Sequence, residues 1–177
     1  NTYTLYRDGV AQSNPDVVTL GVGLYQYIYN VTEGTNFTAN ASLDQKNLTI
    51  TQNTSYVLDI TFSPSDTETY GTSTTITGIN CPTELTCTLY RNETLVSNPD
   101  TGVQAAGIHE YTYNTTGNTN YSAKQVQENL TINKASSVVN LTLNAVDGNV
   151  TINLGDSVNK TGELITGQGT ITKQLNN

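Results

Sequence analysis

The sequence predicts an all-β protein built from repeated sandwich-like modules, with essentially no helix. Composition is the first reason, because 32 Thr and 11 Tyr favour strands whereas 22 Asn and 14 Gly supply turns. Periodicity is the second, since Tyr occupies every other position of the segment Tyr25–Asn30. Leu, Ala, Glu and Lys are too thinly spread to form a periodic helical face. The apolar content of 35% suffices if each core is thin, as it is between two packed sheets.

An internal repeat of 84 residues is the third reason and defines the organisation of the chain. Two long segments recur at this shift, and shorter segments follow them in the same order. The matching pairs are TLYRDGVAQSNPD (4–16) with TLYRNETLVSNPD (88–100), YIYNVTEGTNFTA (27–39) with YTYNTTGNTNYSA (111–123), KNLTI (46–50) with ENLTI (128–132) after a two-residue deletion, and 70–78 with 154–162. With 177 residues, the chain holds about two repeats.

Seven short strands are expected within one complete repeat. They are Tyr56–Phe62, Thr72–Thr77, Leu85–Arg91, Thr94–Ser97, Gly102–Ala106, His109–Asn114 and Lys124–Ile132. Turn signals separate such strands, namely Asp8-Gly9, Asn14-Pro15-Asp16, Asn98-Pro99-Asp100 and Asp147-Gly148-Asn149. Seven strands in about 84 residues with regular turns is the pattern of an immunoglobulin-like sandwich.

The succession NLTINKASSVVNLTLN, TLYRN, YTYNTTGNTNYSA and NLTI resembles the immunoglobulin-like repeats of archaeal and some bacterial cell-surface proteins. It also resembles the subunits of archaeal thread-like filaments, which are joined by donor-strand complementation. The resemblance covers nearly the whole chain and implies tandem immunoglobulin-like β-sandwich modules with incomplete terminal modules. It is specific for architecture and weak for function, because adhesins, surface-layer stalks and filament subunits share it.

The phase of the repeat divides the chain into three segments. Residues 1–52 are expected to form an incomplete module that begins at the third strand, residues 53–134 a complete module, and residues 135–177 the first three strands of another. The strands of the last segment are expected at Val138–Leu143, Ser157–Thr161 and Thr170–Leu175. An incomplete module exposes apolar core and unpaired strand edges, which favours pairing with another chain.

Two functions fit this phase. The first is a structural subunit of a glycosylated extracellular filament or pilus, polymerised head to tail with identical subunits by donor-strand complementation. Residues 2–51 are then the acceptor, and the donor residues are Val138, Val139, Leu141, Leu143 and Val158. The alternative is an immunoglobulin-like repeat fragment of a cell-surface adhesin or surface-layer stalk that binds carbohydrate or a partner cell. The Tyr residues recur at the same repeat positions, which favours core packing over binding.

We expect asparagine glycosylation of this chain and, with it, an extracellular or cell-surface location. Twelve Asn-X-Ser/Thr sequons occur, against roughly five expected by chance from this composition. They are Asn30, Asn36, Asn40, Asn47, Asn53, Asn92, Asn114, Asn120, Asn129, Asn140, Asn149 and Asn159. An Asn- and Thr-rich strand protein also creates sequons by accident, which is the competing explanation. The chain begins at Asn1 rather than Met, as expected after removal of a signal peptide or in an excised fragment.

Charge and hydropathy argue against two classes of partner. Seven basic and fifteen acidic residues give a net charge of −8, whereas nucleic acids and anionic membranes select clusters of Lys and Arg. No apolar stretch approaches the roughly 18 residues that a membrane span requires. We therefore expect no nucleic-acid partner and no membrane insertion.

No constellation of residues indicates an enzyme, a cofactor or a metal site. The single histidine, His109, aligns with Tyr25 and is expected to pack as a ring. Asp16 and Asp100 lie in the repeated turns, where they are expected to cap backbone N–H groups; a calcium site is the alternative. Cys81 and Cys87 are expected to form a disulfide, with a metal-binding pair or a reactive thiol as the alternative.

Overall fold

The computed structural model describes residues 2–172, apart from the side chains of Ser42 and Leu43. These residues contain fourteen strands and no helix, as the composition predicts. The strands are β1 (Tyr3–Arg7), β2 (Val10–Gln12), β3 (Gly23–Val31), β4 (Asn40–Ile50), β5 (Asp59–Ser63), β6 (Thr67–Thr69), β7 (Ser73–Ile79), β8 (Thr88–Arg91), β9 (Thr94–Val96), β10 (Asp100–Val103), β11 (Gly107–Thr115), β12 (Lys124–Asn133), β13 (Val138–Leu143) and β14 (Lys160–Thr166).

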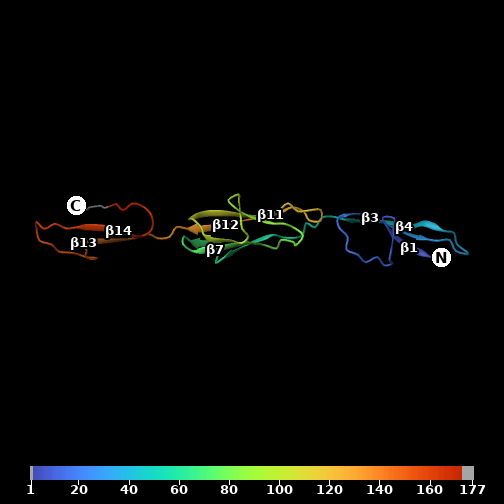
Figure 1. Cartoon of the computed structure of the whole chain (residues 1–177), viewed down its shortest axis with the longest axis horizontal. Helices are drawn as coiled ribbons and strands as arrows, with labels where there is room; N and C mark the ends of the chain where they lie inside the picture. Colours follow the sequence, from blue (N-terminus) through green and yellow to red (C-terminus); the bar gives the residue numbers. More distant parts are fainter. Residues whose placement is uncertain (1, 173–177) are drawn as a thin grey trace.

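The strands fall into three groups, which we call the first unit (β1–β4), the middle unit (β5–β12) and the last unit (β13 and β14). Figure 1 shows the three units following one another along the long axis of the molecule. Each sheet stays within one unit. The first and last units therefore lie at opposite ends of an elongated chain.

The middle unit has two sheets that enclose one hydrophobic core, an arrangement compatible with a β-sandwich. One sheet has the order β10-β7-β5 and the other has the order β6-β12-β11-β8-β9. Alternation along the strands sends every second side chain inward, so that β7 buries Thr74, Ile76 and Gly78. The core contains Leu58, which directly precedes β5, and residues of both sheets, namely Ile60, Ile76, Leu89, Tyr111, Tyr113, Leu130 and Ile132.

The first unit contains the counterpart of only one of these sheets. Its order β2-β1-β3-β4 repeats β9-β8-β11-β12 of the middle unit. The residues that match β10, from Asp16 to Thr19, form no strand. The middle unit supplies the reason, because β10 pairs with β7 alone, and the first unit has no counterpart of β7.

The last unit contains the counterparts of β5 and β7, which belong to the other sheet of the middle unit. Antiparallel β13 and β14 pair Leu143 with Lys160, as β5 and β7 pair Phe62 with Ile76. The expected strand Val138–Leu143 is present as β13, whereas the expected strand Ser157–Thr161 is wrong in position, because β14 runs from Lys160 to Thr166. In β7 the corresponding first residues pair with β10, which the last unit lacks. Part of the expected strand Thr170–Leu175 lies outside the described residues.

The strands expected in the middle unit are present, with ends that differ by at most three residues. The parallel strand β6 is an addition, since its three residues carry no alternation. The Asp8-Gly9 hairpin turn is confirmed, with both residues at positive φ. The hairpin turn that follows β13 lies instead at Asn144 and Ala145, which also have positive φ, and Asp147-Gly148 only bends the chain.

Candidate functional site

The inner face of the first unit exposes residues whose counterparts form the core of the middle unit. Leu130 of β12 is 0% exposed, whereas its counterpart Leu48 of β4 is 42% exposed. Tyr3, which occupies the position of Cys87, is also exposed, and its ring stacks on Tyr29 with centroids 5.8 Å apart. The hydrophobic face of this sheet thus lacks the second sheet that covers it in the middle unit.

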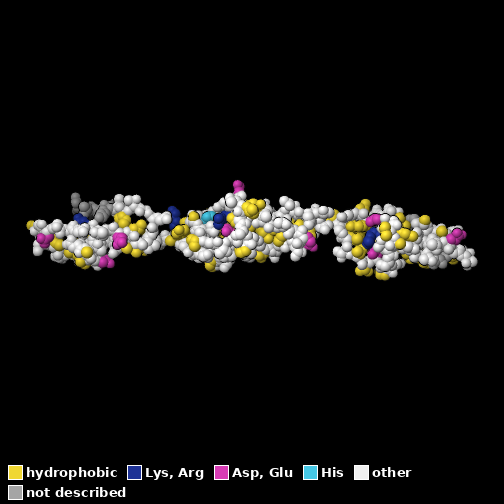
Figure 2. All heavy atoms as spheres, viewed as in Figure 1, with side chains coloured by type: hydrophobic (Ala, Val, Ile, Leu, Met, Phe, Trp, Pro, Cys, Tyr) yellow, Lys and Arg dark blue, Asp and Glu magenta, His cyan; other side chains and the backbone are white. Residues whose placement is uncertain are grey.

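The inner face of the last unit also exposes hydrophobic residues whose counterparts are buried in the middle unit. The pairing of β13 with β14 places Leu141 where β5 has Ile60. Ile60 is 6% exposed and Leu141 is 58% exposed. Val139 shares this face and is exposed as well. Hydrophobic side chains are accordingly visible at the surface of both terminal units in Figure 2.

The expected donor residues separate into three groups in the structure. Val139, Leu141 and Leu143 share the inner face by alternation along β13, whereas Val138 lies on the opposite face and is followed by a bulge. Val158 precedes β14 and is half-buried. The expected set omits Leu164 of β14, which pairs with Val139 and faces inward with it.

A charged cluster recurs in the first and middle units. In the first unit, Arg7 Nη1 lies 2.7 Å from Asp16 Oδ2, and the Tyr27 hydroxyl donates to the same oxygen at 3.0 Å. In the middle unit Arg91 and Tyr111 bind Asp100 Oδ2 at 2.9 and 2.8 Å. The two aspartates therefore bind side chains rather than nearby backbone N–H groups. The signal that could have revealed this cluster is the recurrence of all three residues at the 84-residue shift.

Burial and hydrogen bonding shift the pKa of Tyr111 in the middle unit and of Arg7 in the first unit. Burial, together with the hydrogen bond to Asp100, raises the pKa of Tyr111 to about 12, because the tyrosinate would lie in the core beside a carboxylate. The interaction with Tyr27 and the charge of Asp16 raise the pKa of Arg7. Arg7 thus stays charged and Tyr111 stays neutral at neutral pH.

A glycine in β7 makes room for a core tyrosine. A Cβ atom added at Gly78 would lie 2.4 Å from the ring of Tyr113, closer than any real contact. The residues that correspond to this pair are Gly162 of β14 and Tyr29 of β3. They belong to the last and first units, at opposite ends of the chain.

The disulfide expected between Cys81 and Cys87 is confirmed, and both residues lie in the connection from β7 to β8. It staples the loop beside the core, against which both cysteines pack. His109 Nε2 lies 2.8 Å from the carbonyl oxygen of Ala105, as the Tyr25 hydroxyl lies 3.0 Å from that of Gly21. The histidine ring thus takes the place of a tyrosine ring, and its Nδ1 atom is buried without a partner among the described residues.

The sequon asparagines lie at the surface of all three units. Nine are exposed, and Asn30, Asn114 and Asn140 are half-buried. The side-chain oxygens of Asn53, Asn92 and Asn120 accept hydrogen bonds from backbone N–H groups, which leaves the amide nitrogen that carries an N-linked glycan pointing elsewhere. Their geometry is compatible with modification; occupancy stays a prediction.

The described residues contain no group of three or more His, Cys, Asp or Glu side chains able to hold a metal ion. A depression of about 660 Å³ over β8, β11 and β12 is lined by Thr88, Tyr90, Asn114 and Lys124 among others, with no carboxylate, histidine or cysteine. Within the described part of the chain, no helix is long and apolar enough to cross a membrane.

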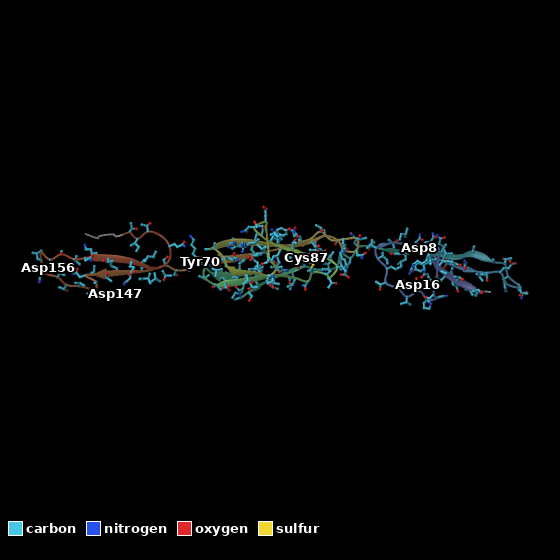
Figure 3. The ribbon with its side chains drawn as sticks, in the orientation of Figure 1. Asp8, Asp16, Tyr70, Cys87, Asp147 and Asp156 are labelled. Atoms are coloured by element: carbon cyan, nitrogen blue, oxygen red, sulfur yellow. A yellow bond between two sulfur atoms is a disulfide. The ribbon has the colours of Figure 1, made fainter. Side chains whose placement is uncertain are left out.

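The open inner faces of the two terminal units are therefore the candidate functional site. In Figure 3, Asp16 marks the first of them and Asp156 lies in the unit that carries the second, at the other end of the molecule. Comparisons of the chain with protein-family models, with curated proteins and with solved structures gave no match.

Proposed function

We propose that this chain is the structural subunit of a glycosylated extracellular filament, in which the last unit of one copy completes the first unit of the next. Each junction would then form an immunoglobulin-like sandwich like the middle unit. The observation that carries the proposal is the exposure of core positions at both ends of one chain. Leu48 and Leu141 are exposed, whereas their counterparts in the middle unit are buried.

The middle unit serves as a template for the junction. In it, β7 lies between β5 and β10. In the junction, β14 of one copy would lie between its own β13 and residues 16–19 of the next copy, which would become a strand. The segment 151–153 corresponds to β6 and would run parallel to β4, as β6 runs parallel to β12. At about 25 cal/mol per Å², burying a few hundred Å² of apolar surface contributes several kcal/mol to such a junction.

The position of the two faces favours an open polymer over a closed dimer. They lie at opposite ends of an elongated chain, so β14 of one copy cannot reach residues 16–19 of the same copy. A head-to-tail contact between different surfaces that does not close produces a filament. Glycans on the exposed sequons would cover the outer strands and limit unwanted edge pairing.

Disulfide trapping tests the proposed pairing directly. In the middle unit Val103 of β10 pairs with Ser73 of β7, and their counterparts are Thr19 and Ser157. The full chain carrying Thr19→Cys and Ser157→Cys is expected to form a ladder of covalent oligomers under mild oxidation, seen on non-reducing gels. Neither substitution removes a sequon.

The matched control moves one cysteine along the same segment. The chain with Val17→Cys and Ser157→Cys places the two thiols two residues out of register, about 7 Å apart along the strand, and is expected to form little or no ladder. Equal ladders from both chains would indicate random collision. No ladder from either chain would contradict the proposal.

The alternative function is a repeat segment of a surface adhesin or stalk. The open depression lined by Tyr90, Thr88 and Asn114 is the observation in its favour, since an aromatic ring beside hydrogen-bonding side chains suits carbohydrate. A chain that stays monomeric and binds glycans through this depression would favour the alternative. Tyr90→Ala would then abolish glycan binding.

A further inference from the structure

One position on the inner face of β14 does not match the core of the middle unit. The alignment by strand pairing places Lys160 where β7 has Ile76, because Leu143 pairs with Lys160 as Phe62 pairs with Ile76. Ile76 is fully buried in the middle unit. Lys160 is exposed in the single chain. In a completed junction its side chain would enter a core position.

A lysine at a buried position is costly unless a carboxylate compensates its charge. The pairing of β10 with β7 identifies which residue would lie beside it. In the middle unit the strand partner of Ile76 is Asp100. The counterpart of Asp100 in the first unit is Asp16. The residue across the strand from Lys160 in a junction is therefore an aspartate of the next copy.

The carboxylate of Asp16 is held in a fixed position in the first unit. Its side chain is 8% exposed and is held by Arg7 and Tyr27, both of which approach Oδ2. The other carboxylate oxygen, Oδ1, accepts neither of these two hydrogen bonds. Side chains of directly opposed residues lie about 5 Å apart, within reach of a lysine ammonium group. The apolar stem of lysine can fill the space that isoleucine fills in the middle unit.

We propose that Lys160 of one copy pairs with Asp16 of the next copy inside the junction and thereby fixes the register of donor-strand insertion. This inference rests on the proposed function and names its residue-level partner. A shift of β14 by two residues would place Lys160 opposite Val18 or Asn14 of the next copy, neither of which carries a negative charge. A shift by one residue would turn the apolar face outward. Only one register places both Lys160 beside Asp16 and Gly162 against Tyr29.

A double-mutant cycle on the ladder-forming chain tests the pair. The measured quantity is the chain concentration that gives half-maximal ladder with Thr19→Cys and Ser157→Cys. Asp16→Asn is expected to raise this concentration at least tenfold when residue 160 is lysine, because the ammonium group loses its partner. In the Lys160→Met chain the same substitution is expected to change it less than threefold. Any damage of Asp16→Asn to the first unit itself cancels in this comparison.

A charge reversal gives the second arm. Lys160→Glu would place a carboxylate beside Asp16, and its ladder is expected to disappear, whereas the ladder of Lys160→Met persists. The inference is overturned if Asp16→Asn has the same effect in both backgrounds, or if Lys160→Glu forms a normal ladder. In either case the ladder of the reference chain still supports the filament. Absence of the reference ladder contradicts the proposed function instead.

Discussion

At the scale of single residues, the Arg–Asp–Tyr cluster links the surface of each sheet to its core. Arg91 reaches across to Asp100 and also donates to Gln104 at 2.7 Å, and Tyr111 joins the same carboxylate from the buried side. Charge-assisted hydrogen bonds of this kind are stronger than neutral ones. In the first unit the same cluster forms without an opposing sheet. It therefore holds residues 13–16 in place before any junction forms.

The titration of Tyr111 gives a prediction for alkaline pH. Its pKa is about 12 in the folded chain and about 10 when unfolded, so deprotonation favours unfolding between these values. Its contribution to stability is fully present below pH 10 and is lost as the pH rises through about 12. The free energy of unfolding, measured with denaturant, is expected to fall by about 2–3 kcal/mol more than in Tyr111→Phe over this range. Equal pH dependence of the two chains would contradict this assignment.

At the scale of strands, a substitution of Gly162 tests whether β14 packs against β3 of the next copy in the proposed register. Gly162→Val is expected to block the covalent ladder, because a side chain there would collide with Tyr29 of the next copy as one at Gly78 would collide with Tyr113. The matched control is Glu163→Val, which lies on the opposite face of β14, keeps every sequon and is expected to leave the ladder intact. A normal ladder from Gly162→Val would show that β14 does not insert in this register.

Strand positions could be predicted where the side chains alternate along a segment and the neighbouring strands are also present in the same unit. The Tyr alternation of β3 and β11 is of this kind, and both strands are present as expected. The segment 16–19 and the start of β14 differ from the prediction because a strand also needs a neighbour, which alternation along one segment does not report. β6 is too short to show a period.

The candidate site could be predicted only in part for a similar reason. The repeat phase indicated which cores are incomplete, and Cys81 with Cys87 lay close enough in sequence to suggest their bond. The Asp16 cluster joins residues nine and eleven positions away across different strands. The role of Lys160 depends on strand register, which only the pairing of β13 with β14 fixes.

At the scale of the whole molecule, one chain has a middle unit with two sheets and two end units that, in the proposed filament, would complete each other between copies. The middle unit would carry no donor or acceptor role and would act as a rigid spacer, stapled by its disulfide. The backbone N–H of Val22, which precedes β3, donates to the side-chain oxygen of Asn120 and connects the first unit to the middle unit. Repetition of such chains would give a filament that alternates middle units with junctions.

The most direct test of the central claim is the mass and shape of the native, unheated protein. Light scattering and electron microscopy are expected to show long filaments that persist in mild detergent, with one chain per axial repeat. Such filaments should shorten to single particles when Gly162→Val is introduced. A stable monomer of 19.1 kDa plus attached glycans, with no assembly at any concentration tested, would contradict the account.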